Sequence, residues 1–321
     1  MVRFLIGVAA ALVAQCALAQ GFPSKPIRIV VAGIPGGGTD IMARLLAEPL
    51  REDLGQPVVV ENKGAGNGIL GSLEVARAAP DGHTVLMIAG SMAIAPSVYA
   101  KLPFDPIADL KPIAQIAQVP LVLVTRKESP VNTVADLVAL ARREGDKVTF
   151  ASFGNATPSH LVGESMNQLA GLKMTHVAYK GGAAALPDIL AGLVTFGILD
   201  AVSMVPQVKG GRVKAIAVTG PKRFPALPDR PTLVESGIAF DAVGWHAAFA
   251  PAGVSADVAH RLNAAFVKAA GRADIRERIV AGGSVPIEPP LSVEQWGARF
   301  RQEVEQWGRV ARTAKITAEV M

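Results

Sequence analysis

The chain has 321 residues, of which 50% are hydrophobic and 18% are charged, and its net charge is +5. This composition excludes intrinsic disorder, and the length is enough for two domains of ordinary size. The single cysteine excludes a disulfide scaffold or a cysteine-ligated metal site. Aromatic residues make up only 5%, which argues against nucleic-acid stacking platforms, and the small, dispersed positive charge does not indicate a polyanionic partner.

Residues 1–20 have the pattern of a secretory signal peptide. Arg3 precedes an apolar run from Phe4 to Val13, which is too short for a stable transmembrane helix, and Ala17-Leu18-Ala19 is a small-x-small cleavage signal. We therefore expect cleavage after Ala19 and a periplasmic mature protein. A lipoprotein signal needs a small residue directly before Cys16, where this chain has a glutamine, so lipidation is the less favoured alternative.

The mature chain begins with alternating strand and helix patterns. Strands are predicted at Ile27–Val31, Pro57–Glu61 and Thr84–Ala89, and helices at Ile41–Asp53 and Gly71–Ala79. Fully apolar strands of this kind are typical of a parallel sheet covered on both faces.

The alternation restarts further along the chain and then gives way to helices. The predicted strands are Leu121–Thr125, Lys147–Ser152, Thr175–Val177, Val194–Leu199 and Val213–Thr219, and the helices are Thr133–Arg143, Ser159–Ala170, Ala183–Ala191, Ala256–Ala270, Arg272–Ala281 and Ser292–Ala311. Thr133 or Asn132 is suited to cap the first of these helices.

The last three predicted helices have no strands of their own, so we expect them to return to the first domain. The chain would then cross between domains near residues 118–124 and 241–249. The predicted organisation is a signal peptide at 1–19, a discontinuous first domain at 22–121 plus 246–321, and a second domain at 122–245. The fold class is α/β, with a mainly parallel sheet and flanking helices in each domain.

The first candidate ligand loop joins the first strand to the first helix and reads Gly33-Ile34-Pro35-Gly36-Gly37-Gly38-Thr39-Asp40. Three consecutive glycines allow close approach of the backbone to a ligand, and exposed N–H groups at a helix N-terminus attract an anion. In open α/β sheets, ligands bind beyond the carboxyl ends of the strands, which is where this loop lies. The alternative is a tight turn in which Asp40 only stabilises its own helix.

Two further loops have the same placement, Ser152-Phe153-Gly154-Asn155-Ala156-Thr157-Pro158-Ser159 and Tyr179-Lys180-Gly181-Gly182-Ala183. The first combines hydroxyl groups, an amide and a helix N-terminus, with Pro158 suited to the first helical turn. Either loop alone could be a plain turn. Three loops of one kind, divided between two domains, indicate a ligand cleft between those domains.

Signals for cofactors and catalysis are weak. Gly66, Gly68 and Gly71 form a G-x-G-x-x-G string, but it follows the second strand and residues 85–100 contain no acidic residue for a ribose. Walker A, G-x-S-x-G and H-E-x-x-H motifs are absent, and the five histidines lack metal-ligand spacing. His160 and Glu164 lie one helical turn apart, as an acid/base or metal pair would, or as packing residues. We expect no cofactor and no metal.

Taken in order, the motifs resemble those of the periplasmic receptors of tripartite tricarboxylate transporters, the Bug family. The similar segments span nearly the whole mature chain and comprise Pro23–Ile27, Pro35–Asp40, Val58–Lys63, Ala79–Gly82, Ser152–Gly154, His160, Gly163-Glu164, His176-Val177, Tyr179–Gly181, Ala217–Thr219, Leu227–Asp229, Pro231-Thr232, Glu235–Gly237 and Ala250–Gly253. The chain departs from the family pattern at Ala32–Pro35, where the family has Pro-Phe-Pro-Pro, and at His83, where it has tyrosine.

The resemblance implies a two-domain, type II-like "Venus flytrap" that closes on a small carboxylate and delivers it to a membrane permease. It implies that backbone groups of the loops hold the ligand, and it places the family's acidic position at or next to Asp200. The ligand-binding residues expected on this basis are Gly36, Gly37, Gly38, Thr39, Asp40, Ser152, Gly154, Asn155, Ala156, Thr157, His160, Tyr179, Lys180, Gly181 and Asp200.

The leading hypothesis is therefore a monomeric binding protein and not an enzyme, with no nucleic-acid partner. Two alternatives stay open. A sensor receptor that presents its ligand to a membrane signalling protein would use the same binding chemistry. A metal-independent carboxylate lyase or isomerase would need an acid/base pair, for which Asp40, His160 and Lys180 are the candidates.

Overall fold

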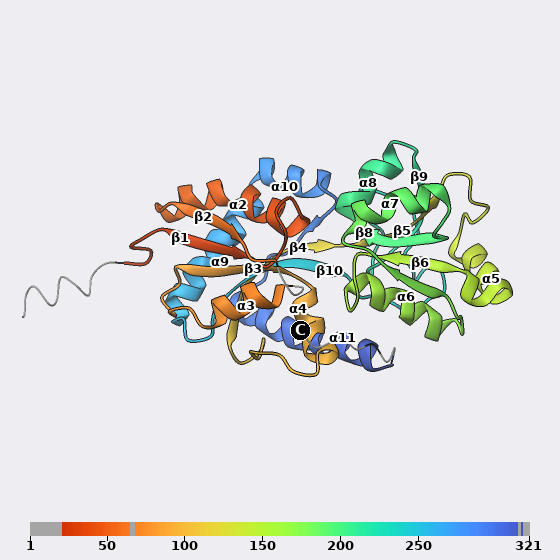
Figure 1. The fold of residues 1–321 in the computed structure, drawn as a ribbon. Helices are drawn as coiled ribbons and strands as arrows, with labels where there is room; N and C mark the ends of the chain where they lie inside the picture. The colour runs from red at the N-terminus through yellow and green to blue at the C-terminus, as the bar shows by residue number, and fades with distance from the viewer. Residues whose placement is uncertain (1–20, 65–67, 314–315, 317–321) are drawn as a thin grey trace, which may run out of the picture.

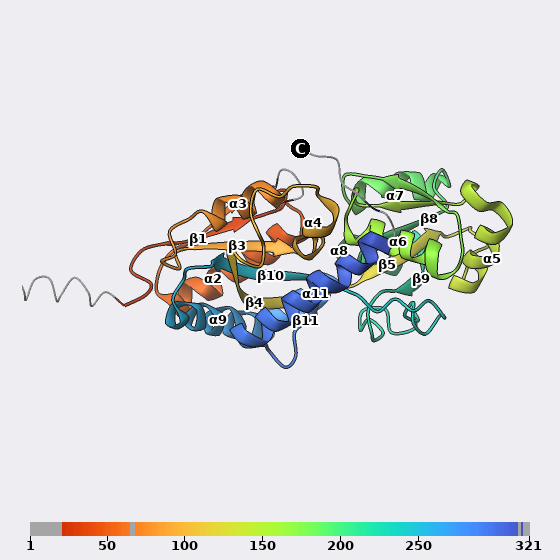
Figure 2. The same cartoon turned by 90° about the horizontal axis from the view of Figure 1, so that it is seen from below.

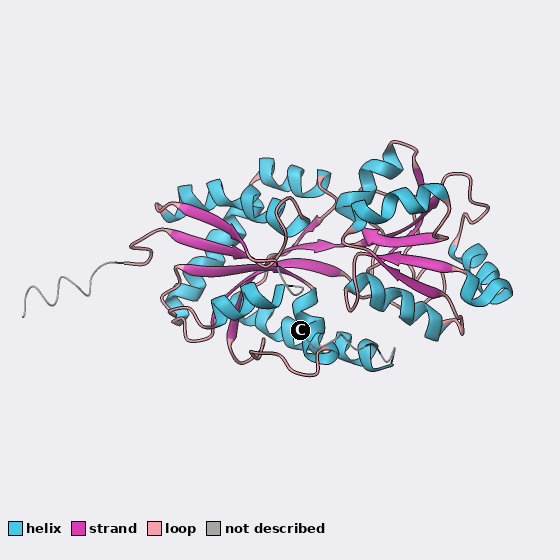
Figure 3. Cartoon of the chain, in the orientation of Figure 1, coloured by secondary structure: helices cyan, strands magenta, loops and turns pink. Residues whose placement is uncertain are grey.

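The computed structural model describes residues 21–64, 68–313 and 316. They form two lobes, each a sheet flanked by helices (Figure 1, Figure 3). The predicted signal peptide and Gly66 lie outside the described residues. Within the described part of the chain, no helix is both long and apolar enough to cross a membrane.

The first lobe contains a six-stranded sheet with the order β11-β4-β10-β3-β1-β2. Its strands are β1 (Ile27–Val31), β2 (Val58–Asn62), β3 (Thr84–Ala89), β4 (Leu110–Val119), β10 (Gly244–Pro251) and β11 (Val285–Pro286). β1 is parallel to β2 and β3, with Ile29 paired to Val60 and to Val85. β10 is antiparallel to β3 and β4, and β11 is antiparallel to β4.

The second lobe contains a five-stranded sheet with the order β7-β6-β8-β5-β9. Its strands are β5 (Leu121–Arg126), β6 (Thr149–Ser152), β7 (Thr175–Ala178), β8 (Phe196–Asp200) and β9 (Val213–Val218). β6 is parallel to β7 and β8, whereas β5 is antiparallel to β8 and β9.

Both sheets are therefore mixed, and the expectation of mainly parallel sheets is wrong. The cause is the double crossing between lobes. β4 leads out of the first lobe, only Pro120 separates it from β5, and β10 leads back in. A strand that enters a lobe from the cleft runs opposite to strands whose carboxyl ends face the cleft, so β5 and β10 pair antiparallel with their neighbours.

Each sheet has helices on both faces. The helices are α2 (Gly38–Leu54), α3 (Ile69–Ala76), α4 (Ser91–Val98), α5 (Val134–Glu144), α6 (Pro158–Leu169), α7 (Gly182–Ala191), α8 (Ala201–Lys209), α9 (Ala256–Gly271), α10 (Ala273–Ala281) and α11 (Val293–Thr313), with a short 3₁₀ turn at Gly145–Lys147. In the first lobe, α2, α9 and α10 cover one face and α3, α4 and α11 the other. In the second lobe, α7 and α8 cover the face opposite α5 and α6.

The C-terminal helix α11 returns to the first lobe, as predicted, and also reaches the second. It packs on α4 and β4 and contacts α6, so it spans the crossing region along one side of the molecule (Figure 2). Its buried stripe includes Trp296, Phe300 and Trp307, and Trp296 meets Trp245 of β10 edge-to-face at 5.2 Å between ring centroids. One continuous apolar cluster thereby joins the two lobes on this side.

The sequence patterns did not predict α4, β4 or α8. Each contains a proline, at positions 96, 112 and 206 respectively. Proline lacks an N–H and breaks the local patterns that indicate helix and strand. These elements form because their apolar residues are buried, as Ile94, Ile113 and Met204 are.

Candidate ligand-binding site

The three predicted loops follow the carboxyl ends of β1, β6 and β7, and Asp200 ends β8. The loops after β1 and β7 both border the first turn of α8. A β-carbon placed on Gly38 would lie 4.0 Å from Cγ2 of Val202 in α8. A β-carbon placed on Gly182, at the start of α7, would lie 2.8 Å from Oδ2 of Asp200 and 3.3 Å from Cβ of Ser203. The first turn of α8 therefore lies close to the N-termini of both α2 and α7.

The lobes also touch beside this point. Gly283, in the turn between α10 and β11, has φ of +83°, and a β-carbon there would lie 2.6–2.7 Å from backbone atoms of Ala201 and Val202. Figure 1 shows the corresponding approach of α10 to α8 between the lobes. Only glycine allows this backbone contact, because any side chain would both be strained at this φ and collide with α8.

The loop after β1 leaves backbone donors open at the N-terminus of α2. Gly37 is the N-cap and has no side chain to accept a hydrogen bond, and the first helical bond runs from Ile41 N–H to Gly37 O. Among the described residues, no acceptor is bonded to the N–H groups of Gly38, Thr39 and Asp40. Such donors at the positive end of a 17-residue helix suit an anion.

The side chain of Asp40 shapes this loop from within. Its carboxylate accepts hydrogen bonds from Gly36 N–H at 2.8 Å, Arg44 Nε at 2.9 Å and Asn62 Nδ2 at 3.0 Å. Burial acts to raise the pKa of Asp40, but these three donors outweigh it and hold the pKa below its ordinary value. Asp40 thus hydrogen-bonds to its own loop, to its own helix through Arg44 and to β2 through Asn62.

In the loop after β6, the hydroxyl groups of Ser152 and Thr157 form hydrogen bonds within the loop itself. Thr157 is the N-cap of α6, where its hydroxyl accepts from His160 N–H and donates to Gly154 O at 2.7 Å. Ser152 Oγ bonds both the N–H and the O of Gly154. Asn155 is exposed and its side chain has no partner within the described residues. Of the side chains predicted to bind the ligand in this loop, that of Asn155 is thus left available, and the backbone N–H groups of Asn155 and Thr157 also have no acceptor among the described residues.

Two histidines, His160 and His176, hydrogen-bond to the same loop. His160 Nδ1 accepts a hydrogen bond from Ala156 N–H at 3.2 Å, while Ala156 has φ of +55°. The rings of His160 and His176 are stacked with 3.7 Å between centroids, and His176 Nε2 lies 2.6 Å from Ser152 Oγ. Burial lowers the pKa of both imidazoles to about 4, so both are neutral at pH 7. His160 is therefore a positioning residue for the loop.

The loop after β7 resembles the first loop more than the second. Gly181, with φ of +104°, is the N-cap of α7 and offers no side-chain acceptor, so the N–H groups of Gly182 and Ala183 point out of the helix end. Lys180 is exposed with no partner among the described residues. Tyr179 is committed elsewhere, because its hydroxyl donates to Asp188 Oδ2 at 2.6 Å. Desolvation and this carboxylate raise the pKa of Tyr179 to about 12.

Asp200 has a structural task as well. It is the N-cap of α8, and its Oδ1 accepts from the N–H and the hydroxyl of Ser203, both at 2.8 Å. Asp40, His160 and Lys180, the candidate acid/base groups, are joined by no hydrogen bond or ion pair. Within the described part of the chain, no group of three or more His, Cys, Asp and Glu residues is placed to hold a metal ion.

Sequence reasoning missed His246, on β10. A β-carbon placed on Gly38 would lie 3.5 Å from its Cε1 and 3.6 Å from its Nε2. The ring is 5% exposed, and its Nδ1 has no hydrogen-bond partner among the described residues. The available signal was a titratable side chain in Gly244–Pro251, a strand otherwise built of buried apolar residues and glycine.

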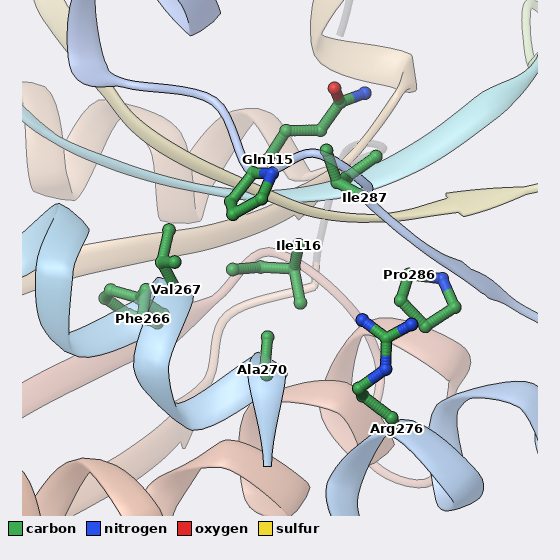
Figure 4. A pocket seen from close by; sticks show the side chains of 10 residues that line it. Gln115, Ile116, Phe266, Val267, Ala270, Arg276, Pro286 and Ile287 are labelled. Carbon is green, nitrogen blue, oxygen red and sulfur yellow. The ribbon is translucent and has the colours of Figure 1, made fainter. Parts of the chain in front are cut away.

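Two cavities lie in the first lobe, away from the loops. One of about 50 Å³ is lined by residues including Ile116, Ala270 and Arg276, and Figure 4 shows the amide of Gln115 pointing away from it. This is room for a few water molecules. A hollow of about 340 Å³ lies between β4, α9 and α11, but Lys111 already donates to Val254 O there. Neither cavity is lined by a predicted site residue.

Comparison with known proteins identifies the family. A model described as the tripartite tricarboxylate transporter family receptor matches residues 42–316. This chain belongs to that receptor family. A UPF0065 protein in the TAR-I ttuE-ttuC' intergenic region of Agrobacterium vitis is 34% identical over 296 residues, which cover 91% of this chain and 85% of the relative.

Solved structures of similar proteins agree with this assignment. The periplasmic binding protein BugD is 33% identical with a TM-score of 0.81, covering 93% of this chain and 100% of its own. An R. palustris protein solved with adipate is 30% identical with a TM-score of 0.83, covering 92% and 99%. MatC from Rhodopseudomonas palustris, solved with bound malate, is 30% identical with a TM-score of 0.77, covering 90% and 99%. The two-lobed receptor fold is thus shared with solute-binding proteins of this family.

Proposed function

We propose that this chain is a periplasmic receptor that binds a small carboxylate between its lobes and delivers it to the permease of a tripartite tricarboxylate transporter. The observation that carries the proposal is the pair of helix N-termini without side-chain caps, those of α2 and α7, close to the first turn of α8. Their N–H groups and helix dipoles favour negative charge without requiring a cationic side chain. Malate and adipate bound to relatives support the carboxylate class.

A thermal-shift screen with matched pairs tests the ligand class. Malate, adipate and other small mono- and dicarboxylates are each compared with the corresponding amide. A ligand at a hundredfold excess over Kd stabilises the native state by about 2.7 kcal/mol, which for a chain of this size raises Tm by about 5–10 °C. A carboxylate should produce this shift and its amide should not. Equal shifts for both, or no shift with any carboxylate, would contradict the proposal.

Closure is the second part of the proposal. A ligand on α2 and α7 touches both lobes, which we take as domains at 22–121 plus 246–321 and 122–245, so it should favour the closed arrangement. Small-angle scattering should give a smaller radius of gyration with the bound carboxylate than without it. Tight binding with an unchanged radius would assign the site to one lobe alone.

Export and delivery are the third part of the proposal; membership of the receptor family supports them, and they are tested separately. The intact mass of protein from the periplasm should begin at Gln20, whereas a lipid-modified N-terminal Cys16 would contradict cleavage after Ala19. Sedimentation should show a monomer. Membrane vesicles that contain the permease should take up the labelled carboxylate only when the loaded receptor is added, and purified receptor alone should leave the carboxylate chemically unchanged.

A further inference from the structure

We propose that His246 is a ligand-contacting, specificity-determining residue, whose Nε2–H donates a hydrogen bond to the carboxylate held at the N-terminus of α2. The inference rests on the proposed function and adds a side-chain contact from the crossing strand β10 to the backbone contacts of the loops. It begins with the environment of the imidazole.

His246 lies where a polar ring is costly. β10 is buried along all eight residues, and His246 pairs in register with Ala89 at the end of β3 and with Ala117 of β4. A buried polar group without a hydrogen-bond partner costs free energy, and Nδ1 of this ring has none among the described residues. The free-energy cost of burying this imidazole is partly offset if its other nitrogen, Nε2, forms a hydrogen bond with a bound ligand.

That other nitrogen faces the open helix end. Nε2 would be 3.6 Å from a β-carbon on Gly38, the residue whose N–H begins the unbonded row of α2. When the ring proton is on Nε2, this nitrogen and the first N–H groups of α2 are all donors without an acceptor in the described part of the chain. A carboxylate satisfies them together, since one oxygen accepts from the N–H groups of α2 while the other accepts from Nε2–H.

The ring acts as a neutral donor. Burial lowers the pKa of His246 to about 4, so at pH 7 the ring carries one N–H and no charge. A carboxylate oxygen beside Nε2 selects the tautomer with the proton on that nitrogen. The corresponding primary amide binds less well, because its NH₂ group could face Nε2 only if the ring took the other tautomer, which would bury an Nδ1–H that has no acceptor among the described residues.

The space beside the ring restricts what enters. A β-carbon placed on Gly38 would lie 4.0 Å from Cγ2 of Val202 and 3.6 Å from Nε2 of His246, so these three residues lie close together where the two lobes meet. A planar carboxylate can present one oxygen to the N–H groups of α2 and the other to Nε2–H, whereas the tetrahedral oxygens of a phosphate or sulfate also need room outside that plane. His246 thus contributes to choosing the anion as well as holding it.

Three variants test the proposal, with the tightest-binding carboxylate of the malate and adipate panel as the probe in calorimetry. His246→Phe keeps a ring and removes the donor, and should lower affinity at least tenfold while reducing the preference for carboxylate over amide. His246→Gln retains an N–H at similar reach and should recover affinity to within about fivefold of the native protein. Gln115→Met removes another buried, unpartnered polar group, from the neighbouring β4, and should leave affinity unchanged.

A spectroscopic readout separates contact from packing. In protein labelled with ¹⁵N-histidine, the carboxylate should move the Nε2 resonance of His246 to that of a hydrogen-bonded donor. Native affinity in His246→Phe, equal losses in His246→Phe and Gln115→Met, or an unmoved Nε2 signal on binding would each overturn the inference. If His246→Phe does not fold, the proposal is tested by the affinity of His246→Gln and by the Nε2 resonance of the labelled native protein. Absence of carboxylate binding by the native protein would instead overturn the proposed function itself.

Discussion

The loops after β1 and β6 look alike in the sequence but differ in what they leave available. Each ends a strand, opens a helix and contains glycine and hydroxyl residues. The N-cap of α2 is Gly37, which accepts no hydrogen bond through a side chain, whereas the N-cap of α6 is Thr157, which does. The Thr157 hydroxyl accepts from one N–H group of the first turn of α6, whereas the first three N–H groups of α2 have no acceptor among the described residues.

The same contrast recurs within the second lobe. α7 begins at Gly181 without a side-chain cap, while α8 begins at Asp200, which is bonded to Ser203. In chain order, α2 and α7 thus begin without a side-chain cap, while α6 and α8 begin with one. The comparison teaches that capping, more than glycine content, decides whether the N–H groups at these helix ends have an acceptor within the described chain.

The largest effect is expected from filling the open end of α2. Gly38→Val would place methyl groups against His246 and Val202, because even a single β-carbon would lie within 3.5–4.0 Å of them. Affinity for the carboxylate should fall at least a hundredfold by calorimetry. Tm without ligand should stay within about 3 °C, since the lobes can part to accommodate the side chain.

Gly271→Val is the matched control for this substitution. Gly271 ends α9, and a β-carbon there would meet nothing within 4 Å. It should bind the carboxylate with native affinity. If Gly38→Val retained native affinity, the N-terminus of α2 would not be part of the binding site, and its difference from α6 would have no role in binding.

The supporting loop should lose stability at acidic pH. The folded-state pKa of His160 and His176 is about 4, below the unfolded value of about 6.5, so the unfolded chain takes up protons first as pH falls. Their contribution is intact above pH 6.5 and is lost as pH falls to 4, by about 2–4 kcal/mol for the pair. Glu164 offsets part of this loss, because burial raises its pKa. Urea unfolding from pH 7 to pH 4 measures the net slope.

The variant His160→Asn isolates the imidazole in that measurement. Its Oδ1 can replace Nδ1 as acceptor for Ala156 N–H, but it does not titrate. The loss of stability between pH 6.5 and 4 should shrink by about 1–3 kcal/mol. An identical slope in both proteins would show that the stacked pair does not govern the acid response.

Disturbing the internal support of the open loop should affect both binding and stability. In Asp40→Asn, an amide replaces the acceptor of Gly36 N–H and the partner of Arg44. We expect a loss of about 1–2 kcal/mol in unfolding free energy at pH 7, and about a tenfold loss of affinity through a less ordered loop. The native Asp40 contribution is full above its unfolded pKa and is lost as pH falls through its lower folded value. The unfolding free energies of the native protein and Asp40→Asn should therefore become equal at the lowest pH. A difference that stays constant with pH would contradict the assigned contacts of Asp40.

The smallest effect is expected at the closed end. Thr157→Ala removes the N-cap of α6 and should cost about 1 kcal/mol of unfolding free energy, with carboxylate affinity changed less than twofold. Thr157→Ser should restore the stability. A large loss of affinity in Thr157→Ala with unchanged stability would mean that the hydroxyl serves the ligand, as the sequence alone had suggested.

Local signals predicted much of this molecule. The strands of Ile27–Val31 and Thr84–Ala89, the helix C-terminal to Thr133 and the return of the last helices are confirmed, with Thr133 forming a capping box with Asp136. Each depends on periodicity, apolar runs or capping residues within a few positions of one another, which are properties of the chain itself. The placement of the loops beyond strand ends follows from the same alternation.

The tertiary structure alone decided which of those groups remain free. Whether a donor is open depends on residues distant in the chain, as with Asn62 beside Asp40 and His176 beside His160. The direction of β5 and β10 depends on where the chain crosses between lobes, and that crossing also brings His246 to Gly38. Short-range patterns therefore determined the elements and the composition of the loops, while long-range packing and strand direction determined the mixed sheets, the satisfied polar groups and the helix ends left open for a ligand.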